Sequence, residues 1–87
     1  MFDWNHGNAE HIALHFVSIE EVEEALLDPR RIGIPAFGAQ DEVRYCAIGS
    51  TEEARVLVVV FTNRHGMIRA ISARDATRRE RRRYQRR

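Results

Sequence analysis

The sequence has 87 residues and a mass of 10.1 kDa, which suits one domain, residues 1–87, and leaves no room for a second core. Hydrophobic residues make up 44% and charged residues 31%, as in ordinary globular proteins, and no apolar run reaches the roughly 20 residues that cross a bilayer. Cys46 is the only cysteine, so an internal disulfide is excluded. The start lacks a signal-peptide pattern, so a cytoplasmic protein is expected, with Cys46 buried as a small apolar side chain.

The net charge of +1 hides an uneven distribution of charge along the chain. Residues 1–43 contain two arginines and nine acidic residues, whereas residues 44–87 contain twelve arginines and four acidic residues. Every basic residue is an arginine, whose planar guanidinium group suits phosphate. This asymmetry predicts an anionic partner for the second half of the chain.

A first helix is predicted from Asn5, which suits the N-cap position. Apolar residues recur after it at the three- and four-residue steps of a helix: Ala9, Ile12, Ala13 and Phe16. The segment before it, residues 2–4, is too short to assign alone and could add an edge strand.

A second helix is predicted over residues 18–27. Ser18 and Glu21 have the spacing of a capping box, and Val17 and Val22 have that of a hydrophobic staple. The helix stops before Pro29, because the residue that precedes a proline avoids the helical conformation.

After Pro29 the hydrophobic period becomes that of strands. Strands are predicted over 31–35, 43–48, 55–62 and 67–74, with turns at 49–53 and 63–66. A capping box of Thr77 and Glu80 then predicts a helix from residue 77, docked through Ala76 and Tyr84 and frayed past Gln85. The predicted fold class is α+β, with two N-terminal helices, a three- to four-stranded antiparallel sheet and a C-terminal helix.

Several side chains are candidates for chemistry, each with a structural alternative. His11 and His15 are four residues apart and could ligate a metal, but no third ligand is evident, so no metal site is predicted. Capping, phosphate contact or proton transfer are the other interpretations. Trp4 and Tyr84 suit either packing or contact with RNA, and Tyr84 could also donate a proton. The glutamates at 20–24 suit a solvated face better than a general base.

The arginines are a stronger signal as a group than singly. Arg74 follows the last strand, and Arg78 and Arg79 lie in the first turn of the predicted helix, where cations oppose the helix dipole and suit anion binding. Arg44 lies on a strand and Arg64 at a hairpin tip. A solvated surface is the alternative for any one of them. Glycine-rich phosphate loops, zinc-finger spacings and helix-turn-helix signatures are missing from the sequence, so composition alone predicts only a small α+β domain with a basic end.

Several segments of the chain, in order and over nearly its whole length, together form a recognisable pattern: Phe2-Asp3-Trp4, Asn8, His11-Ile12, His15, Val17-Ser18, Glu20-Glu21, Asp28-Pro29, residues 57–62 and residues 71–84. This pattern resembles the BrnT family of type II toxin–antitoxin toxins, ribonucleases with a RelE-like fold. The closing pattern S-A-R-x-A-T-x-x-E-R-x-x-Y, from Ser72 to Tyr84, is the longest and carries most of the resemblance. Many members have lysine before the second histidine and glycine after it, whereas this chain has Leu14 and Phe16.

The resemblance implies a metal-independent endoribonuclease without a cofactor, which cleaves mRNA and so inhibits translation. It also implies a ribbon-helix-helix antitoxin as partner, with a toxin–antitoxin heterotetramer as one expected assembly. We expect Arg74 and Arg78 to neutralise phosphate and His15 or Tyr84 to move a proton. The expected RNA contacts are Arg44, Arg64, Arg78, Arg79, Trp4 and His11.

Two other functions remain open at this stage. Leu14 in place of the family's lysine favours a catalytically weak or inactive module that binds RNA or the antitoxin. A DNA-binding regulator is a weaker alternative, because no recognition helix is evident.

Overall fold

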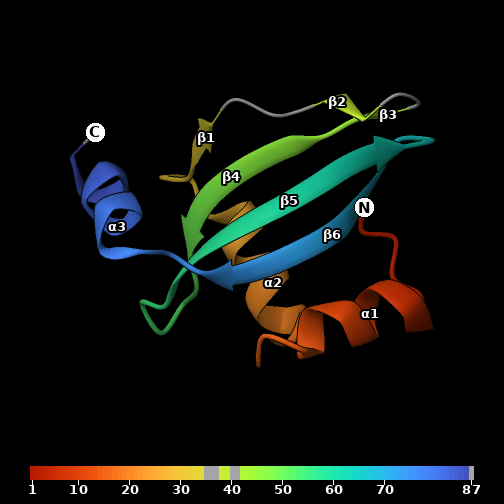
Figure 1. Ribbon diagram of the computed structural model, residues 1–87, viewed down its shortest axis with the longest axis horizontal. Helices are drawn as coiled ribbons and strands as arrows, with labels where there is room; N and C mark the ends of the chain where they lie inside the picture. Colours follow the sequence, from red (N-terminus) through yellow and green to blue (C-terminus); the bar gives the residue numbers. More distant parts are fainter. Residues whose placement is uncertain (35–37, 40–41, 87) are drawn as a thin grey trace.

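The computed structural model describes residues 1–34, 38–39 and 42–86. Two helices, α1 (His6–Ala13) and α2 (Ile19–Leu27), precede a four-stranded antiparallel sheet, and α3 (Arg78–Gln85) follows it (Figure 1). The predicted α+β order of elements is therefore confirmed. Within the described residues, the helices are all too short and polar to span a bilayer.

The main sheet has the strand order β1-β4-β5-β6. Its strands are β1 (Ile32–Ile34), β4 (Tyr45–Ser50), β5 (Val56–Arg64) and β6 (Met67–Asp75). A second pair, β2 (Gly38–Ala39) with β3 (Glu42–Val43), was not predicted. Beyond the sheet's β6 edge, Phe2 forms a single parallel bridge with Ile68, so residues 2–4 do extend that edge, though only by one bridge.

Three predicted boundaries are wrong. The first helix ends at Ala13 rather than at Phe16, because residues 14–16 form a turn. The strand predicted over 43–48 runs from Tyr45 to Ser50, so Gly49 lies in a strand, paired with Leu57, and not in a turn. β5 continues to Arg64 because only His65 and Gly66 are needed to turn the chain. The end of the predicted strand 31–35 lies outside the described residues.

The predicted caps are present at all three helices. Asn5 caps α1 through a reciprocal pair of hydrogen bonds with Asn8, of 2.7 and 3.0 Å. Ser18 and Glu21 make the same arrangement at α2, at 2.9 and 3.1 Å. These local hydrogen bonds satisfy amides that the first helical turn leaves without partners, which is why the helices begin at these residues.

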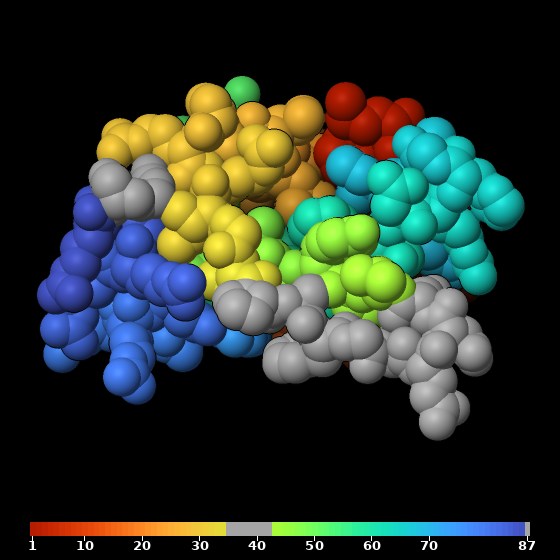
Figure 2. All heavy atoms as spheres, turned by 90° about the horizontal axis from the view of Figure 1, so that it is seen from above, coloured from red at the N-terminus to blue at the C-terminus, as the bar shows by residue number. Residues whose placement is uncertain are grey.

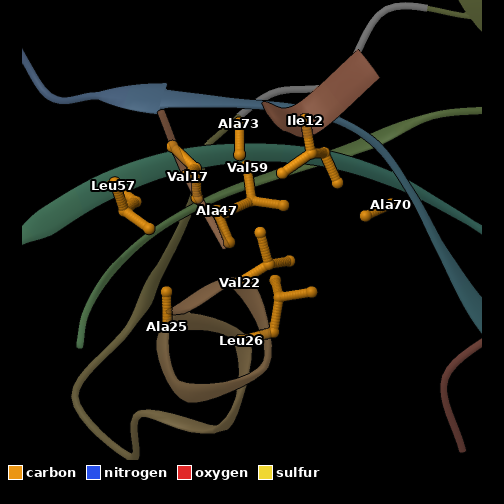
Figure 3. Close-up of a cluster of buried hydrophobic side chains, with 10 residues drawn as sticks. All are labelled: Ile12, Val17, Val22, Ala25, Leu26, Ala47, Leu57, Val59, Ala70 and Ala73. Atoms are coloured by element: carbon orange, nitrogen blue, oxygen red, sulfur yellow. The ribbon is translucent and has the colours of Figure 1, made fainter. Parts of the chain in front are cut away.

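The sheet has a different apolar cluster on each face, because successive side chains of a strand point to opposite sides. One face carries the helix-side core, in which α1 and α2 pack on the sheet (Figure 3); its buried residues are Ile12, Val17, Val22, Ala25, Leu26, Ala47, Leu57, Val59, Ala70 and Ala73. The other face carries the α3-side cluster of Cys46, Ile48, Val58 and Ala76, with Tyr84 packed against it. The predicted burial of Cys46 and the docking of α3 through Ala76 and Tyr84 are confirmed.

We expect Gly49→Ala to destabilise the protein by about 2 kcal/mol or more. A Cβ atom at Gly49 would lie 2.1 Å from the carbonyl oxygen of Ala25, so α2 would have to move off β4. Gly33→Ala is the matched control, because a Cβ atom there meets nothing within 4 Å. Urea unfolding of both variants measures the effect, and equal stabilities would contradict it.

Candidate functional site

Arg74 attaches α3 to the sheet through an ion pair with Glu80. It pairs with Val58 in the β5–β6 ladder, so its side chain projects from the α3 side of the sheet. Its Nη1 and Nη2 atoms donate to Oε1 and Oε2 of Glu80 at 2.7 and 3.0 Å. Glu80 also completes the predicted capping box of α3, since its Oε1 accepts from the Thr77 amide at 2.9 Å and its own amide donates to the Thr77 hydroxyl at 3.2 Å. One carboxylate thus both caps α3 and ties it to β6.

The pairing fixes the charge of both groups. Hydrogen bonds from Arg74 lower the pKa of Glu80 to about 2, and those same bonds raise the pKa of Arg74. At neutral pH the two charges are therefore permanent. A phosphate that approaches Arg74 has to compete with a carboxylate that already accepts two hydrogen bonds from it.

Tyr84 provides the second attachment of α3, one turn after the first. Its hydroxyl donates to Oδ2 of Asp28 over a short 2.5 Å, and the same oxygen accepts from the Ser50 amide at 2.9 Å. Asp28 is the C-cap residue of α2, so this contact joins the end of α2, the end of β4 and the last turn of α3. The hydroxyl of Tyr84 is consequently oriented by a carboxylate.

The surface around Tyr84 is acidic. Tyr84 and Asp28 line a groove of about 560 Å³ between α2 and the end of β4. Its other charged residues are Glu20, Glu23, Glu24 and Glu52. Carboxylates repel phosphate, so an RNA backbone would meet unfavourable electrostatics on this side of Tyr84.

The two candidate histidines lie on the other layer of the molecule. His11 is an exposed residue of α1, and His15 is an exposed residue of the turn that follows, so they do not share one face of the helix. α1 packs on the helix-side core, whereas Arg74 and Tyr84 belong to the opposite face. Among the described residues, no hydrogen bond or ion pair joins His15 to Arg74 or to Tyr84.

Arg55 connects the turn that carries His15 to the strand end that carries Arg74. Its Nη1 donates to the carbonyl oxygen of Phe16 at 2.9 Å and to Glu21 at 3.1 Å, and its Nε and Nη2 donate to Asp75 at 2.7 and 3.1 Å. The hydrogen bonds to Asp75 and Glu21 raise the pKa of Arg55, and the bond from Arg55 lowers the pKa of Asp75. The pKa of Glu21 is lowered by the hydrogen bond from the Ser18 amide and also by Arg55. The sequence did not single out Arg55, because its partners Glu21 and Asp75 lie 34 and 20 residues away in the chain.

Phe16 occupies a strained position next to His15. Its φ of 57° lies in the left-handed region that favours glycine, and its side chain is 90% exposed. Many members of the family that the sequence resembles have glycine at this position. Phenylalanine here therefore costs free energy of folding. Leu14 is also largely exposed, at 69%. The turn therefore presents two apolar side chains to solvent around His15.

The expected RNA contacts do not form one cluster. Arg78 and Arg79 are exposed in the first turn of α3, which begins four residues after Arg74 in the chain. The β5–β6 hairpin tip, where Arg64 ends β5, lies at the opposite end of the molecule from α3 (Figures 1 and 2). Arg44 is half-buried just before β4.

Trp4 is half-buried on the helix side of the sheet. It packs against the helix-side core, and its indole N–H donates to Oε2 of Glu23 at 2.7 Å. Of the residues expected at the site, Arg74 and Tyr84 lie on the α3 side of the sheet, and Arg78 and Arg79 lie on α3 itself. His11, His15, Trp4 and Arg64 lie away from this group.

No group of three or more His, Cys, Asp or Glu side chains is arranged to hold a metal within residues 1–34, 38–39 and 42–86. Burial raises the pKa of the Cys46 thiol, which keeps it protonated. The groups available for chemistry around α3 are therefore guanidinium groups, a phenol and carboxylates.

The fold and the basic α3 beside the last strand define a small α+β protein that suits an anionic ligand. A family model described as "Ribonuclease toxin, BrnT, of type II toxin-antitoxin system" matches residues 4–80. A comparison with curated proteins finds no match. The chain belongs to the BrnT family of ribonuclease toxins, which implies an antitoxin partner and an RNA target. The resemblance noted in the sequence is thereby confirmed.

Replacing Glu80 by glutamine should reveal the pH range in which the ion pair with Arg74 stabilises the protein. Glutamine keeps an acceptor for the cap but removes the charge. Because the folded-state pKa of Glu80 is about 2, below its ordinary value of 4.5, the stabilisation is present above the ordinary value and is lost as the pH falls toward 2. At neutral pH we expect the free energy of unfolding of the wild type to exceed that of Glu80→Gln by about 1 kcal/mol. The difference is this small because solvent around Arg74 weakens the ion pair.

Urea unfolding of both proteins at several pH values measures this difference. Glu53→Gln, on the exposed turn after β4, is the control for loss of a carboxylate. A difference that stays constant from neutral to acidic pH would show that the ion pair is not its source.

Replacing Phe16 by glycine should stabilise the protein by about 0.5–1 kcal/mol. The substitution removes a left-handed strain of about 1–2 kcal/mol, partly offset by the greater backbone freedom of glycine in the unfolded chain. Leu14→Gly is the control, because Leu14 has an ordinary helical φ of −60°. This variant should lose stability. Thermal unfolding compares the two, and a destabilised Phe16→Gly would mean that the side chain supports the fold.

Proposed function

We propose that the protein is a metal-independent endoribonuclease of the RelE-like kind, which cleaves mRNA in the cytoplasm and so inhibits translation. Membership of the BrnT family supports the ribonuclease class. The single observation that best supports the site is the position of Arg74, which lies at the end of β6 between the sheet and an arginine-rich helix. A guanidinium group there suits the charge that develops on a phosphate during cleavage.

The proposed mechanism needs one cation and groups that move protons. Arg74 binds the phosphate and offsets the added negative charge of the transition state, and the carboxylate of Glu80 is the group that phosphate displaces. Tyr84 or His15 moves a proton. These two residues lie on opposite layers, so they are alternatives for this step rather than partners in it. Asp28 supports Tyr84 by orienting its hydroxyl.

The remaining contacts follow from position. Arg78 and Arg79 begin α3, shortly after Arg74 in the chain. They are proposed to bind the phosphates next to the cleaved linkage. Arg44, Arg64, Trp4 and His11 lie farther away and are proposed to contact RNA only beyond the cleaved linkage. The proposed protein partner is a ribbon-helix-helix antitoxin, in a complex such as a heterotetramer, and DNA contact belongs to that antitoxin.

The second candidate is a catalytically weak or inactive module of the same fold that binds RNA or the antitoxin. It is favoured by a specific observation, since Arg74 and the Tyr84 hydroxyl both already engage carboxylates of the chain itself. Leu14, in place of the lysine found in many members, favours it too.

A pair of substitutions separates catalysis from support of the fold. Arg74→Gln should lower RNA cleavage by about 100-fold or more, because one preorganised cation at the phosphate is lost. Glu80→Gln should retain or raise cleavage, because it frees Arg74 from its carboxylate. If Arg74 only supported α3, both variants would lose activity together. The assay uses purified protein, labelled RNA and EDTA, with expression-dependent growth arrest as a second readout.

Further variants assign the proton-transfer step. Tyr84→Phe and His15→Ala are compared in the same assay, and the one that loses cleavage identifies the residue involved. Full cleavage by Arg74→Gln would remove this site. Binding of RNA by wild type without any product would support the inactive module instead.

A further inference from the structure

A second groove runs along the outer side of α3. It has a volume of about 470 Å³ and is lined by Arg79, Glu80, Arg82, Arg83 and Arg86. Three of these arginines, at 82, 83 and 86, are not among the RNA contacts expected from the sequence. We call the four arginines with their groove the arginine groove.

Helical geometry places the four arginines on one flank of α3. Successive residues are about 100° apart, so positions 79, 82, 83 and 86 fall within one side, while Glu80 and Tyr84 point toward the sheet and Arg78 and Arg81 lie on the far flank. From Arg79 to Arg86 the groove extends about 10 Å along the helix axis. It is a strip of charge that suits an elongated ligand.

The four arginines have no partner within the described chain. All are exposed, and no hydrogen bond or ion pair of their side chains is present among residues 1–34, 38–39 and 42–86. The one carboxylate that lines the groove, that of Glu80, is already committed to Arg74 and to the helix cap. By contrast, Arg81 on the far flank donates to the Ala76 carbonyl at 3.3 Å.

This arrangement is unfavourable for folding alone. Like charges three and four residues apart destabilise a helix, and Arg79 in the first turn also opposes the helix dipole. Only the arginines near the C-terminus gain from that dipole. The charge excess is therefore best explained by a ligand with several negative charges spaced along a line.

We propose that the arginine groove binds the backbone of single-stranded RNA through successive phosphates, without reading base sequence. Guanidinium groups pair with phosphate in a bidentate manner, and the groove shares Glu80 with Arg74, so the bound strand leads to that ion pair. The inference rests on the proposed function for the identity of the polyanion. It assigns Arg82, Arg83 and Arg86 to binding and not to the chemical step.

Salt dependence of binding tests the proposal. Each phosphate contact to a single strand contributes about 0.7 to the slope of log K against log salt concentration. Arg82→Gln with Arg86→Gln should reduce the steepness of that slope by about 1.4 and weaken binding at low salt. The probe is a fluorescent 2′-O-methyl oligouridylate, which lacks the 2′-hydroxyl, and the readout is fluorescence anisotropy at several salt concentrations.

The matched control is Arg30→Gln with Arg81→Gln. It removes the same charge from exposed residues outside the groove and should leave the slope nearly as in wild type. Circular dichroism verifies that both double variants fold. Equal slopes for the two double variants would overturn the proposal, as would a wild-type protein that does not bind the probe.

The same assay separates RNA binding by the groove from binding of an acidic protein and from the nuclease proposal. A labelled oligoglutamate that binds wild type as tightly as the RNA probe would assign the groove to an acidic protein and overturn the RNA assignment. If wild type binds the probe through the groove but cleaves no RNA, the nuclease proposal fails and the groove proposal stands.

Discussion

The bidentate ion pair between Arg74 and Glu80 is the contact on which the position of α3 depends most. A helix of eight residues is not stable in water by itself, and α3 has no fully buried residue. Its apolar contacts with the sheet come from Tyr84 and from Ala76 just before it. Because Glu80 serves both the cap and the ion pair, loss of its charge weakens the start of the helix and its attachment together. The direction of the exposed arginines depends on this attachment.

The docked helix also separates two surfaces of opposite charge. On one side of α3, Tyr84 and Asp28 border a groove rich in glutamates of α2, and on the other side lies the arginine groove. The acidic first half and the basic second half of the sequence thus form oppositely charged surfaces on the two sides of α3. Around α3, an anionic ligand meets favourable electrostatics on the arginine side and unfavourable electrostatics on the glutamate side.

The sequence predicted what local patterns determine. The capping boxes at α2 and α3 and the run of β-branched residues in β5 specify elements over a few residues, and the motif from Ser72 to Tyr84 identified the family. It did not predict the partners of Arg55 or the contact between Tyr84 and Asp28, because these join residues 20 to 56 positions apart. It also extended the first helix to Phe16, since an apolar residue at helical spacing gives no sign that the backbone has already turned to a positive φ.

The order of α3 is the most direct test of this account. Backbone ¹⁵N relaxation of residues 78–85 should give order parameters close to those of β5, about 0.85, at neutral pH. The values should fall only slightly in the Glu80→Gln variant, because the ion pair with Arg74 is lost while glutamine keeps the cap of α3. Order parameters below about 0.6 in the wild-type helix would contradict the account, because neither Arg74 nor the arginine groove would then have a fixed geometry.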